Sequence, residues 1–502
     1  MKNSLPSNEF IRYGKRKNIH AKPQSRKGRA KTFKNLTANC FDHPKVFLCD
    51  IFAPLRLCVR FCLSLFGYRS LALGKWSCLF LFFASSLSWI SCQKNAQSNK
   101  IRFVSLAWQE PAIQASKAIV AEWNQKHPEM PVEYVQNNWS AIHDYLVTSF
   151  ETGDVPDVFQ YESTMISDFA ARGNLADLAP LLSSEFRQDI VEGAWASVRG
   201  HNGGISGVPF VLESLTVLYN KDLFQKSGIT PPPTDHPWTW EDVRAAARKL
   251  TIDTNNDGVI DQYGAAIGLR NSANIILNLT LAFGGGYFQK EKERHVVRVG
   301  EPEKKLLATL MAMMYEDKTM SPAGIGQSGP SLLGGFYNGN YAIVLGIGVW
   351  ARQQILENAP KDFHWGVLPA IKGVTQQQGF NAQTLSIPRA SKKQREAMAF
   401  IEFFANTENL TRLAIADAML PSRKSCIRSA AFQSEENGWN VAITLVDHLT
   451  IGPWLQAPGF AEWKTRVANP IFQELFSNRL TVDAAAQRME EESNRVLQRY
   501  QQ

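Results

Sequence analysis

Apolar positions in residues 100–160 alternate between short extended runs and helical stripes. Residues 101–108, 131–135 and 156–161 are rich in β-branched and aromatic side chains and predict three strands. Residues 112–127 and 141–151 carry apolar side chains at helical spacing and predict the helices between those strands. Because strand, helix and strand alternate, the pattern favours an α/β fold with a largely parallel sheet.

A longer apolar run at residues 208–219 is interrupted by a single carboxylate, Glu213, and closed by polar residues 220–222. The run predicts a strand that leaves one compact unit and enters another. A charge in the middle of a strand is costly unless it faces water or a partner. Glu213 is therefore either an exposed or salt-bridged strand residue, or an acceptor for a ligand at the floor of a cleft between two lobes.

The pattern after residue 230 predicts a second α/β unit and a helical end. Thr239 and Asp242 have the spacing of a capping box and predict the start of a helix. The charged run Lys290–His295 predicts a solvated loop. Further helices are predicted at 274–283, 303–314, 392–405 with Ser391 as the cap, and 481–502, and further strands at 341–350, 363–369 and 384–387.

Composition agrees with several folded units, because 502 residues with 44% hydrophobic and 20% charged residues are too many for one ordinary core. The net charge of +8 is unevenly distributed. The first 92 residues hold 16 of the 54 basic residues and three of the 46 acidic ones, which leaves 38 basic and 43 acidic residues beyond them. The mildly acidic body removes the electrostatic argument for nucleic-acid binding.

The segment 76–91 has no charged residue, follows Arg69 and Lys75, and ends before Cys92. Basic, apolar and then small residues are the order of a signal peptide, and the run is short for a membrane span. The end of the segment resembles a bacterial lipoprotein processing site, which implies lipidation of Cys92. Six of the seven cysteines lie in the first 92 residues, so the body, with Cys426 alone, has no cysteine framework.

A loop at residues 253–264 has the spacing of a calcium site. Position 6 of that loop is Gly258, but position 12, where a bidentate glutamate belongs, is Gly264. A tight turn rich in Asp and Asn needs the same residues, so we expect no cofactor, with calcium as the alternative. Oxygen side chains occupy positions 1, 3, 5 and 9: Asp253, Asn255, Asp257 and Asp261.

The loops after the first and third predicted strands are the best candidates for a binding site in the first unit. They are Trp108–Glu110 and Tyr161–Thr164. In open α/β sheets, ligands bind beyond the carboxyl ends of the strands, so both loops are expected to face the same crevice.

Many segments resemble, in order, the extracellular solute-binding proteins of ABC importers, in the sugar-binding family that includes maltose-binding protein. They span about residues 100–500 and are Pro156–Val158, Leu212–Asp222, Trp238–Asp242, Asp253–Gly264, Gly348–Trp350, Ser386–Pro388, Leu420–Arg423 and Arg479–Asp483. The resemblance implies an α/β, two-lobe periplasmic-binding-protein-like fold with hinge crossovers, a ligand held between the lobes, and no catalysis.

The resemblance also implies site residues. Tyr161 matches the family's aromatic after the third strand, Glu213 its crossover carboxylate, and Trp350 its stacking aromatic in the second lobe, while Trp463 falls near a further aromatic position. The resemblance does not extend to the recognition of maltose itself, because Thr164 and Met165 stand where maltose-binding protein has an acid and an arginine. The full set expected to bind ligand is Trp108, Gln109, Glu110, Tyr161, Glu162, Thr164, Glu213, Trp350 and Trp463.

The predicted protein is an extracytoplasmic monomer, in the periplasm or at the cell surface, that captures a sugar or polyol and delivers it to the permease subunits of an ABC importer. A glycoside-processing enzyme and a ligand-sensing receptor lobe are the alternatives. The predicted organisation is a basic extension at 1–67 that is disordered or a start-site overcall, a lipoprotein-type signal peptide at 68–92, a tether at 93–100, lobe 1 at 101–212 and 379–425, lobe 2 at 213–378, and a C-terminal helical segment at 426–502 that packs on the lobes.

Overall fold

A computed structural model describes residues 99–200, 203–292 and 294–500. The predicted extension, signal peptide and lipidated Cys92 lie outside the described residues.

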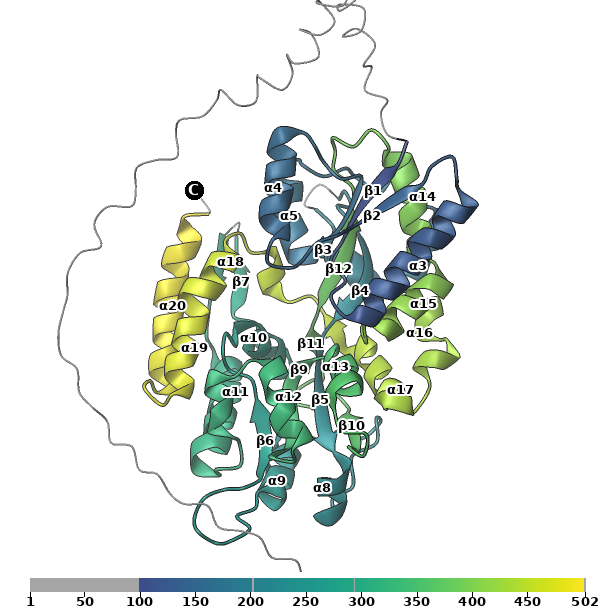
Figure 1. Cartoon of the computed structure of the whole chain (residues 1–502). Helices are drawn as coiled ribbons and strands as arrows, with labels where there is room; N and C mark the ends of the chain where they lie inside the picture. The colour runs from purple at the N-terminus through teal and green to yellow at the C-terminus, as the bar shows by residue number, and fades with distance from the viewer. Residues whose placement is uncertain (1–98, 201–202, 293, 501–502) are drawn as a thin grey trace, which may run out of the picture. The chain divides into compact units, whose positions relative to one another are not determined.

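The first sheet has six strands in the order β13-β4-β12-β3-β1-β2 (Figure 1). β1 runs parallel to β2 and β3, whereas β12 is antiparallel to both β3 and β4. The prediction of a largely parallel sheet therefore holds for the first four strands, and the returning chain makes the sheet mixed. The strands are β1 (Ile101–Ser105), β2 (Val132–Gln136), β3 (Val158–Glu162), β4 (Val208–Glu213), β12 (Asn381–Ser386) and β13 (Leu420–Pro421).

Helices cover both faces of this sheet, with α3, α14 and α15 on one face and α4 and α5 on the other (Figure 1). Their apolar stripes bury side chains such as Trp123 and Phe404 against the strands, so strands and helices share one core. The helices are α3 (Glu110–Lys126), α4 (Ile142–Thr152), α5 (Ser163–Ala171), α6 (Ser184–Asp189), α7 (Glu192–Ala196), α14 (Gln394–Phe404), α15 (Thr407–Ala416) and α16 (Lys424–Ile427).

The second sheet has four strands in the order β10-β5-β9-β6. β9 is buried along its whole length between an antiparallel β5 and a parallel β6. These elements are β5 (Leu215–Asn220), β6 (Tyr263–Ile267), β9 (Tyr341–Gly348), β10 (Trp365–Leu368), α8 (Lys221–Lys226), α9 (Trp240–Leu250), α10 (Ala273–Ala282), α11 (Glu301–Met311), α12 (Gly329–Tyr337) and α13 (Ala351–Asn358).

The segment 208–220 passes from one sheet to the other as two strands, rather than as the single strand predicted. β4 ends at Glu213 in the first sheet, and β5 begins at Leu215 in the second. Ser214 lies between them and donates a hydrogen bond to the carbonyl oxygen of Gly379 at 3.0 Å. Glu213 therefore lies at the end of a strand, where its charge is easier to accommodate than in the middle of a sheet.

Of two local predictions for the second lobe, the structure confirms one and contradicts the other. The predicted capping box is confirmed, because Thr239 Oγ1 accepts from the amide of Asp242 and an Asp242 carboxylate oxygen accepts from the amide of Thr239. The predicted loop at 290–295 is wrong: β7 (Phe288–Glu291) and β8 (Arg294–Val297) form a hairpin there. Its charges obscured the buried strand positions Phe288 and Val297.

The predicted helix cap at Ser391 lies two residues too early. α14 has Lys393 as its N-cap, and Ser391 Oγ instead accepts from the amide of Lys393 at 3.2 Å.

The end of the chain packs mainly on the second lobe. α19 (Asn469–Phe476) and α20 (Val482–Gln498) bury their apolar faces in its core beside α11 (Figure 1). The remaining elements are α17 (Trp439–Ala442), α18 (Phe460–Trp463), β11 (Gln378–Gly379), β14 (Leu449–Thr450), η1 (Ala312–Glu316), η2 (Pro322–Gly326), η3 (Ala430–Phe432), η4 (Glu436–Gly438), η5 (Ile443–His448), η6 (Pro453–Gln456) and η7 (Lys464–Ala468). Within the described ranges, none of the helices has the length and apolar character that a membrane crossing needs.

Candidate functional site

Several of the predicted site residues gather at one edge of the first sheet. Glu162 ends β3 and Glu213 ends β4, while Trp108 and Gln109 lie just beyond the end of β1. These strands run in the same direction, so their carboxyl ends share an edge, as predicted.

Asn381, the first residue of β12, connects the two carboxylates at that edge. It pairs in register with Glu213 and donates a hydrogen bond from Nδ2 to Glu162 Oε2 at 2.6 Å. Its own carbonyl oxygen, Oδ1, accepts from Ser163 Oγ at 3.0 Å. The Asn381 side chain is thus held on both sides, and it fixes the position of Glu162.

The second lobe contributes an aromatic side chain to the same place. Trp350 follows β9, and its indole Nε1 donates to Glu213 Oε1 at 3.0 Å. Its ring lies 5.9 Å from that of Trp108, edge to face at 74°. Trp108 keeps 45% of its surface exposed, so this pair from two lobes includes an indole that a ligand can reach.

A network of amides and a carboxyl group continues the contact between the lobes. Gln109 is buried, and its Nε2 donates to Asp417 Oδ1 at 2.9 Å and to the Asp417 carbonyl oxygen at 2.8 Å. Gln354 of α13 donates to Gln109 Oε1 at 3.1 Å. We call the whole set the interlobe site, and its members are Trp108, Gln109, Glu162, Glu213, Trp350, Gln354, Asn381 and Asp417.

Arg352 lies beside the interlobe site and is fully buried. Its Nη2 donates to the carbonyl oxygen of Ala418 at 2.9 Å, and its guanidinium stacks 3.6 Å above the centre of the Trp439 ring. Burial lowers the pKa of Arg352 to about 9. Arg352 thereby attaches the start of α13 to the turn before β13 and to α17.

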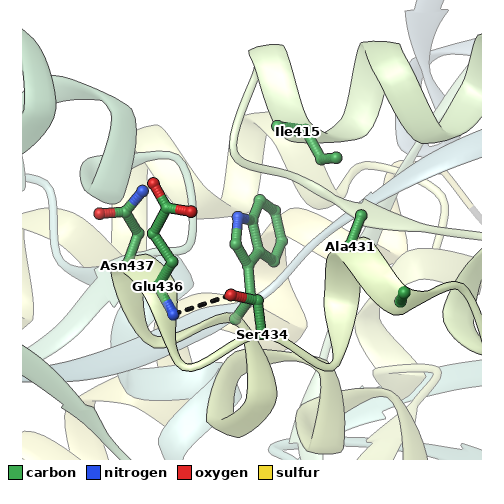
Figure 2. A pocket seen from close by; sticks show the side chains of 7 residues that line it. Ile415, Ala431, Ser434, Glu436 and Asn437 are labelled. Carbon is green, nitrogen blue, oxygen red and sulfur yellow. Dashed lines mark hydrogen bonds between the residues drawn. The ribbon is translucent and has the colours of Figure 1, made fainter.

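A pocket of about 440 Å³ lies beside Trp439 and contains none of the predicted site residues (Figure 2). Its polar side chains are Ser434, Glu436 and Asn437, and Ser434 Oγ accepts from the amide of Glu436 at 3.0 Å. The pocket therefore shares no lining residue with the interlobe site.

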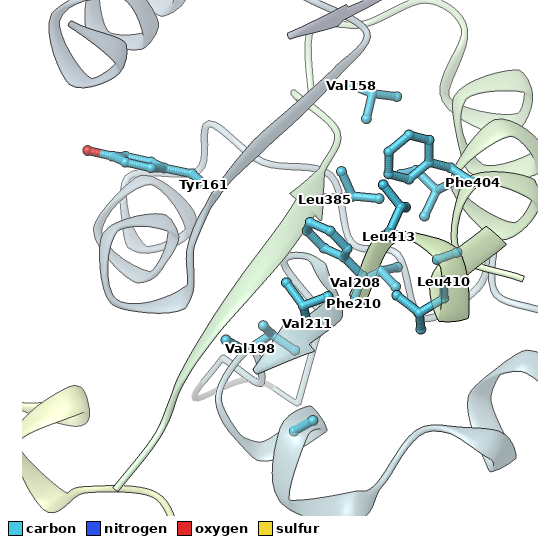
Figure 3. Close-up of a cluster of buried hydrophobic side chains, with 14 of the residues drawn as sticks. Val158, Tyr161, Val198, Val208, Phe210, Val211, Leu385, Phe404, Leu410 and Leu413 are labelled. Atoms are coloured by element: carbon cyan, nitrogen blue, oxygen red, sulfur yellow. The ribbon is translucent and has the colours of Figure 1, made fainter. Parts of the chain in front are cut away.

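Tyr161 is not part of the interlobe site. Its side chain is buried and packs beside Trp139 and Phe169, at ring distances of 6.2 and 6.4 Å. Successive strand residues point to opposite faces, so Tyr161 points away from Val158 and Leu385 (Figure 3). Burial, with the nearby charge of Glu162, raises the pKa of its hydroxyl. These contacts favour a core role for Tyr161.

Glu110 and Thr164 lie at the starts of helices rather than in the network. Glu110 is exposed on the first turn of α3, where its Oε1 accepts from Gln114 at 2.6 Å. Thr164 is half-buried on the first turn of α5.

The prediction that Trp463 binds ligand is corrected by the structure. Its side chain has no exposed surface, its ring packs on Phe288 at 4.7 Å, and its Nε1 donates to Ser493 at 2.6 Å. It therefore belongs to the core of the second lobe. Its place beside α20 could not be predicted, because the contact depends on how the last helix folds back.

The Asp253–Asp261 loop uses its oxygens to hold its own turn. Asp253 Oδ2 accepts from the amide of Gly258, and Asp261 Oδ2 accepts from the amide of Thr254, both at 2.8 Å. A side chain at Gly264 would meet the carbonyl oxygen of Ala247, so the twelfth position cannot supply a carboxylate. Across the described ranges, no group of three His, Cys, Asp or Glu side chains could hold a metal ion. The donor set fits calcium incompletely, so the absence of a cofactor stays the prediction and calcium its alternative.

Two carboxyl groups of the interlobe site, those of Glu213 and Asp417, have raised pKa values. Burial, the charge of Glu162 and that of Asp417 raise the pKa of Glu213 to about 7, although the hydrogen bond from Trp350 opposes the shift. Burial raises the pKa of Asp417 to about 7 against the hydrogen bond from Gln109. Sequence reasoning missed Asp417, Asn381 and Gln354, because only the return of the chain brings them to this edge.

These shifts predict a pH dependence of stability. Between the usual pKa of a carboxyl group and about 7, the folded protein holds protons that the unfolded chain has lost, so stability decreases as the pH rises through this range. We expect each of the two groups to lower the free energy of unfolding by about 2 kcal/mol between about pH 5.5 and about pH 8. Urea titrations at both pH values measure this difference.

Asp417→Asn should reduce the pH dependence, because asparagine keeps the acceptor for Gln109 and cannot titrate. Asp168→Asn, at an exposed position on α5, is the control and should leave the slope unchanged. An Asp417→Asn variant with the full wild-type slope would contradict the assignment.

Solved structures show which class of fold this is. MalE from Xanthomonas citri is 19% identical with a TM-score of 0.68 and covers 80% of this chain and 98% of its own. The substrate-binding protein Lmo0181 from Listeria monocytogenes is 21% identical with a TM-score of 0.65 and covers 80% and 99%. The fold is that of the two-lobe ABC substrate-binding proteins.

Sequence comparisons show the family. The family model described as bacterial extracellular solute-binding protein matches residues 107–410. An uncharacterized lipoprotein in the oleD 5' region of Streptomyces antibioticus is 37% identical over 385 residues, 76% of this chain and 83% of the relative. The diacetylchitobiose binding protein DasA of Streptomyces coelicolor is 23% identical over 298 residues, 59% of this chain and 67% of the relative. The chain belongs to the bacterial extracellular solute-binding proteins.

Proposed function

We propose that this protein captures a carbohydrate at the interlobe site and delivers it to the permease of an ABC importer. The observation that carries the proposal is the joining of Trp108 from one lobe with Trp350 from the other, beside the carboxylates Glu162 and Glu213. Indole faces pack on the C–H faces of a sugar, and carboxylates accept its hydroxyl hydrogens. Related proteins support the class of ligand, because they are described with diacetylchitobiose and cycloalternan as ligands.

A ligand screen of the purified full chain tests the proposal. Mono- and oligosaccharides, polyols and sugar phosphates are added, and tryptophan fluorescence and the melting temperature are followed. A saturable fluorescence change with a raised melting temperature is expected for at least one saccharide, because a ligand that binds only the folded state stabilises it. A panel in which no saccharide produces either change would overturn the proposal.

The same screen distinguishes binding from catalysis. A binding protein returns the saccharide intact after prolonged incubation, whereas a glycoside-processing enzyme releases shorter products. Chromatography of the recovered sugar measures the difference.

A lipid anchor is the second part of the proposal. Cys92 follows an apolar segment with a basic flank, and the relative from Streptomyces antibioticus is described as a lipoprotein. Anchoring would hold the protein at the membrane surface close to its permease. Labelling with a radioactive fatty acid should mark the wild type and not Cys92→Ser, and equal labelling of the two would contradict the anchor.

A further inference from the structure

Three carboxyl groups of the interlobe site each keep an oxygen atom that accepts no hydrogen bond from the described residues. Glu162 uses only Oε2, Glu213 only Oε1, and Asp417 only Oδ1. Asp417 is 8% exposed, but its free oxygen still has solvent-accessible surface. The free oxygens of the two glutamates are accessible to solvent as well. Because these oxygens are open to solvent, they are available as acceptors for a ligand that enters the interlobe site.

No basic side chain of the described residues forms an ion pair with these three carboxyl groups. Arg352, the buried base beside them, directs its guanidinium to the Ala418 carbonyl oxygen and to Trp439. The charges of Glu162 and Asp417 both act on Glu213, which shows that the three groups share one electrostatic environment. Like charges in such a place are costly until a positive charge arrives.

The aromatic side chains at this place favour the same kind of ligand. Trp108 and Trp350 lie beside Glu213, and an indole face attracts a cation as well as the C–H face of a sugar. Hydroxyl groups would satisfy the free acceptors too, but only a cation would also favour the ionised forms of Glu213 and Asp417, which burial keeps largely protonated below about pH 7.

We propose that the interlobe site prefers a saccharide that carries a protonated amine over the corresponding neutral saccharide. An ammonium group donates hydrogens, has no acceptor and carries a positive charge, so it suits carboxyl oxygens without a donor better than a neutral hydroxyl group does. This inference rests on the proposed function, because it specifies the chemistry of the same ligand.

Three disaccharides with the same β-1,4 linkage test the preference: those of glucosamine, N-acetylglucosamine and glucose. They differ at carbon 2, where they carry an amine, an acetamide and a hydroxyl group. Titration calorimetry on the full chain at about pH 6.5 should show at least about tenfold tighter binding of the glucosamine disaccharide. This advantage should shrink as salt is added, because salt screens the attraction between charges.

Two variants identify the groups responsible. Glu213→Gln and Asp417→Asn retain an acceptor for Trp350 and Gln109 but lose the charge, so each should reduce the preference for the amine by about tenfold. Glu192→Gln, at an exposed position on α7, is the matched control and should leave the preference unchanged.

Proton release gives an independent measurement. A bound ammonium group favours the ionised carboxyl groups, so binding at about pH 6.5 should release protons, and the heat should depend on the ionisation enthalpy of the buffer. Binding of the glucose disaccharide should show a smaller dependence.

The outcomes separate the two proposals. Equal or tighter binding of the neutral disaccharides would overturn the preference and leave the proposed function standing. Binding of only the glucosamine disaccharide would support both. If the chain binds none of these disaccharides but does bind other neutral saccharides, the preference is overturned alone, and if it binds no saccharide at all, both proposals are overturned.

Discussion

Replacing Trp350 by alanine should weaken binding of a saccharide ligand by about 30-fold, roughly 2 kcal/mol. The substitution removes the indole that lies against Trp108 and donates to Glu213, and with it the second lobe's aromatic contribution to the interlobe site. Trp350 is only half-buried, so the loss of folding stability should be smaller than that of a core tryptophan. Titration calorimetry and urea denaturation on the same sample measure both quantities.

Trp365→Ala is the matched control for this prediction. Trp365 is also half-buried in the second lobe, but it pairs with Asn220, at the opposite end of β5 from the Leu215 end that approaches Trp350. The Trp365→Ala variant should lose about as much folding stability as Trp350→Ala and keep the wild-type affinity for the saccharide. If Trp350→Ala kept full affinity and lost much stability, Trp350 would be a core residue only.

The part of the site that could be predicted from the sequence is the part that depends on strand ends. Trp108 and Glu162 follow predicted parallel strands, and the rule that such ends share an edge places them together. Glu213 was singled out as a lone carboxylate in an apolar run and Trp350 through the resemblance to a family, and the structure adds the hydrogen bond between them.

The part that could not be predicted depends on the returning chain. Asp417 follows a helix as an ordinary surface charge would, and its burial arises because β13 adds to the edge of the sheet beside β4. Asn381 and Gln354 carry no local signal either, since their partners lie 219 and 245 residues away. Sequence periodicity indicates which face of a helix or strand a residue occupies. It does not identify hydrogen-bond partners that lie more than 200 residues away in the sequence.

Tyr161 and Trp463 show the same limit for aromatic residues. A large ring that packs in a core and one that binds a sugar have the same sequence pattern, because both need apolar surface and a polar partner. The structure distinguishes the two by exposure, which is 45% for Trp108, 5% for Tyr161 and 0% for Trp463.

Trp463→Ala should therefore reduce the free energy of unfolding by about 3–5 kcal/mol, the loss expected when a fully buried tryptophan leaves a cavity. The variant also loses the donor to Ser493, so a buried hydroxyl on α20 is left without its partner. Urea denaturation measures the loss, and calorimetry at low temperature, where the variant remains folded, should show unchanged affinity. Trp463→Phe keeps most of the apolar volume and removes the N–H group, so its loss should be smaller. Weakened binding with a small loss of stability would instead return Trp463 to the binding site, and would require the lobes to rearrange so that its ring becomes accessible.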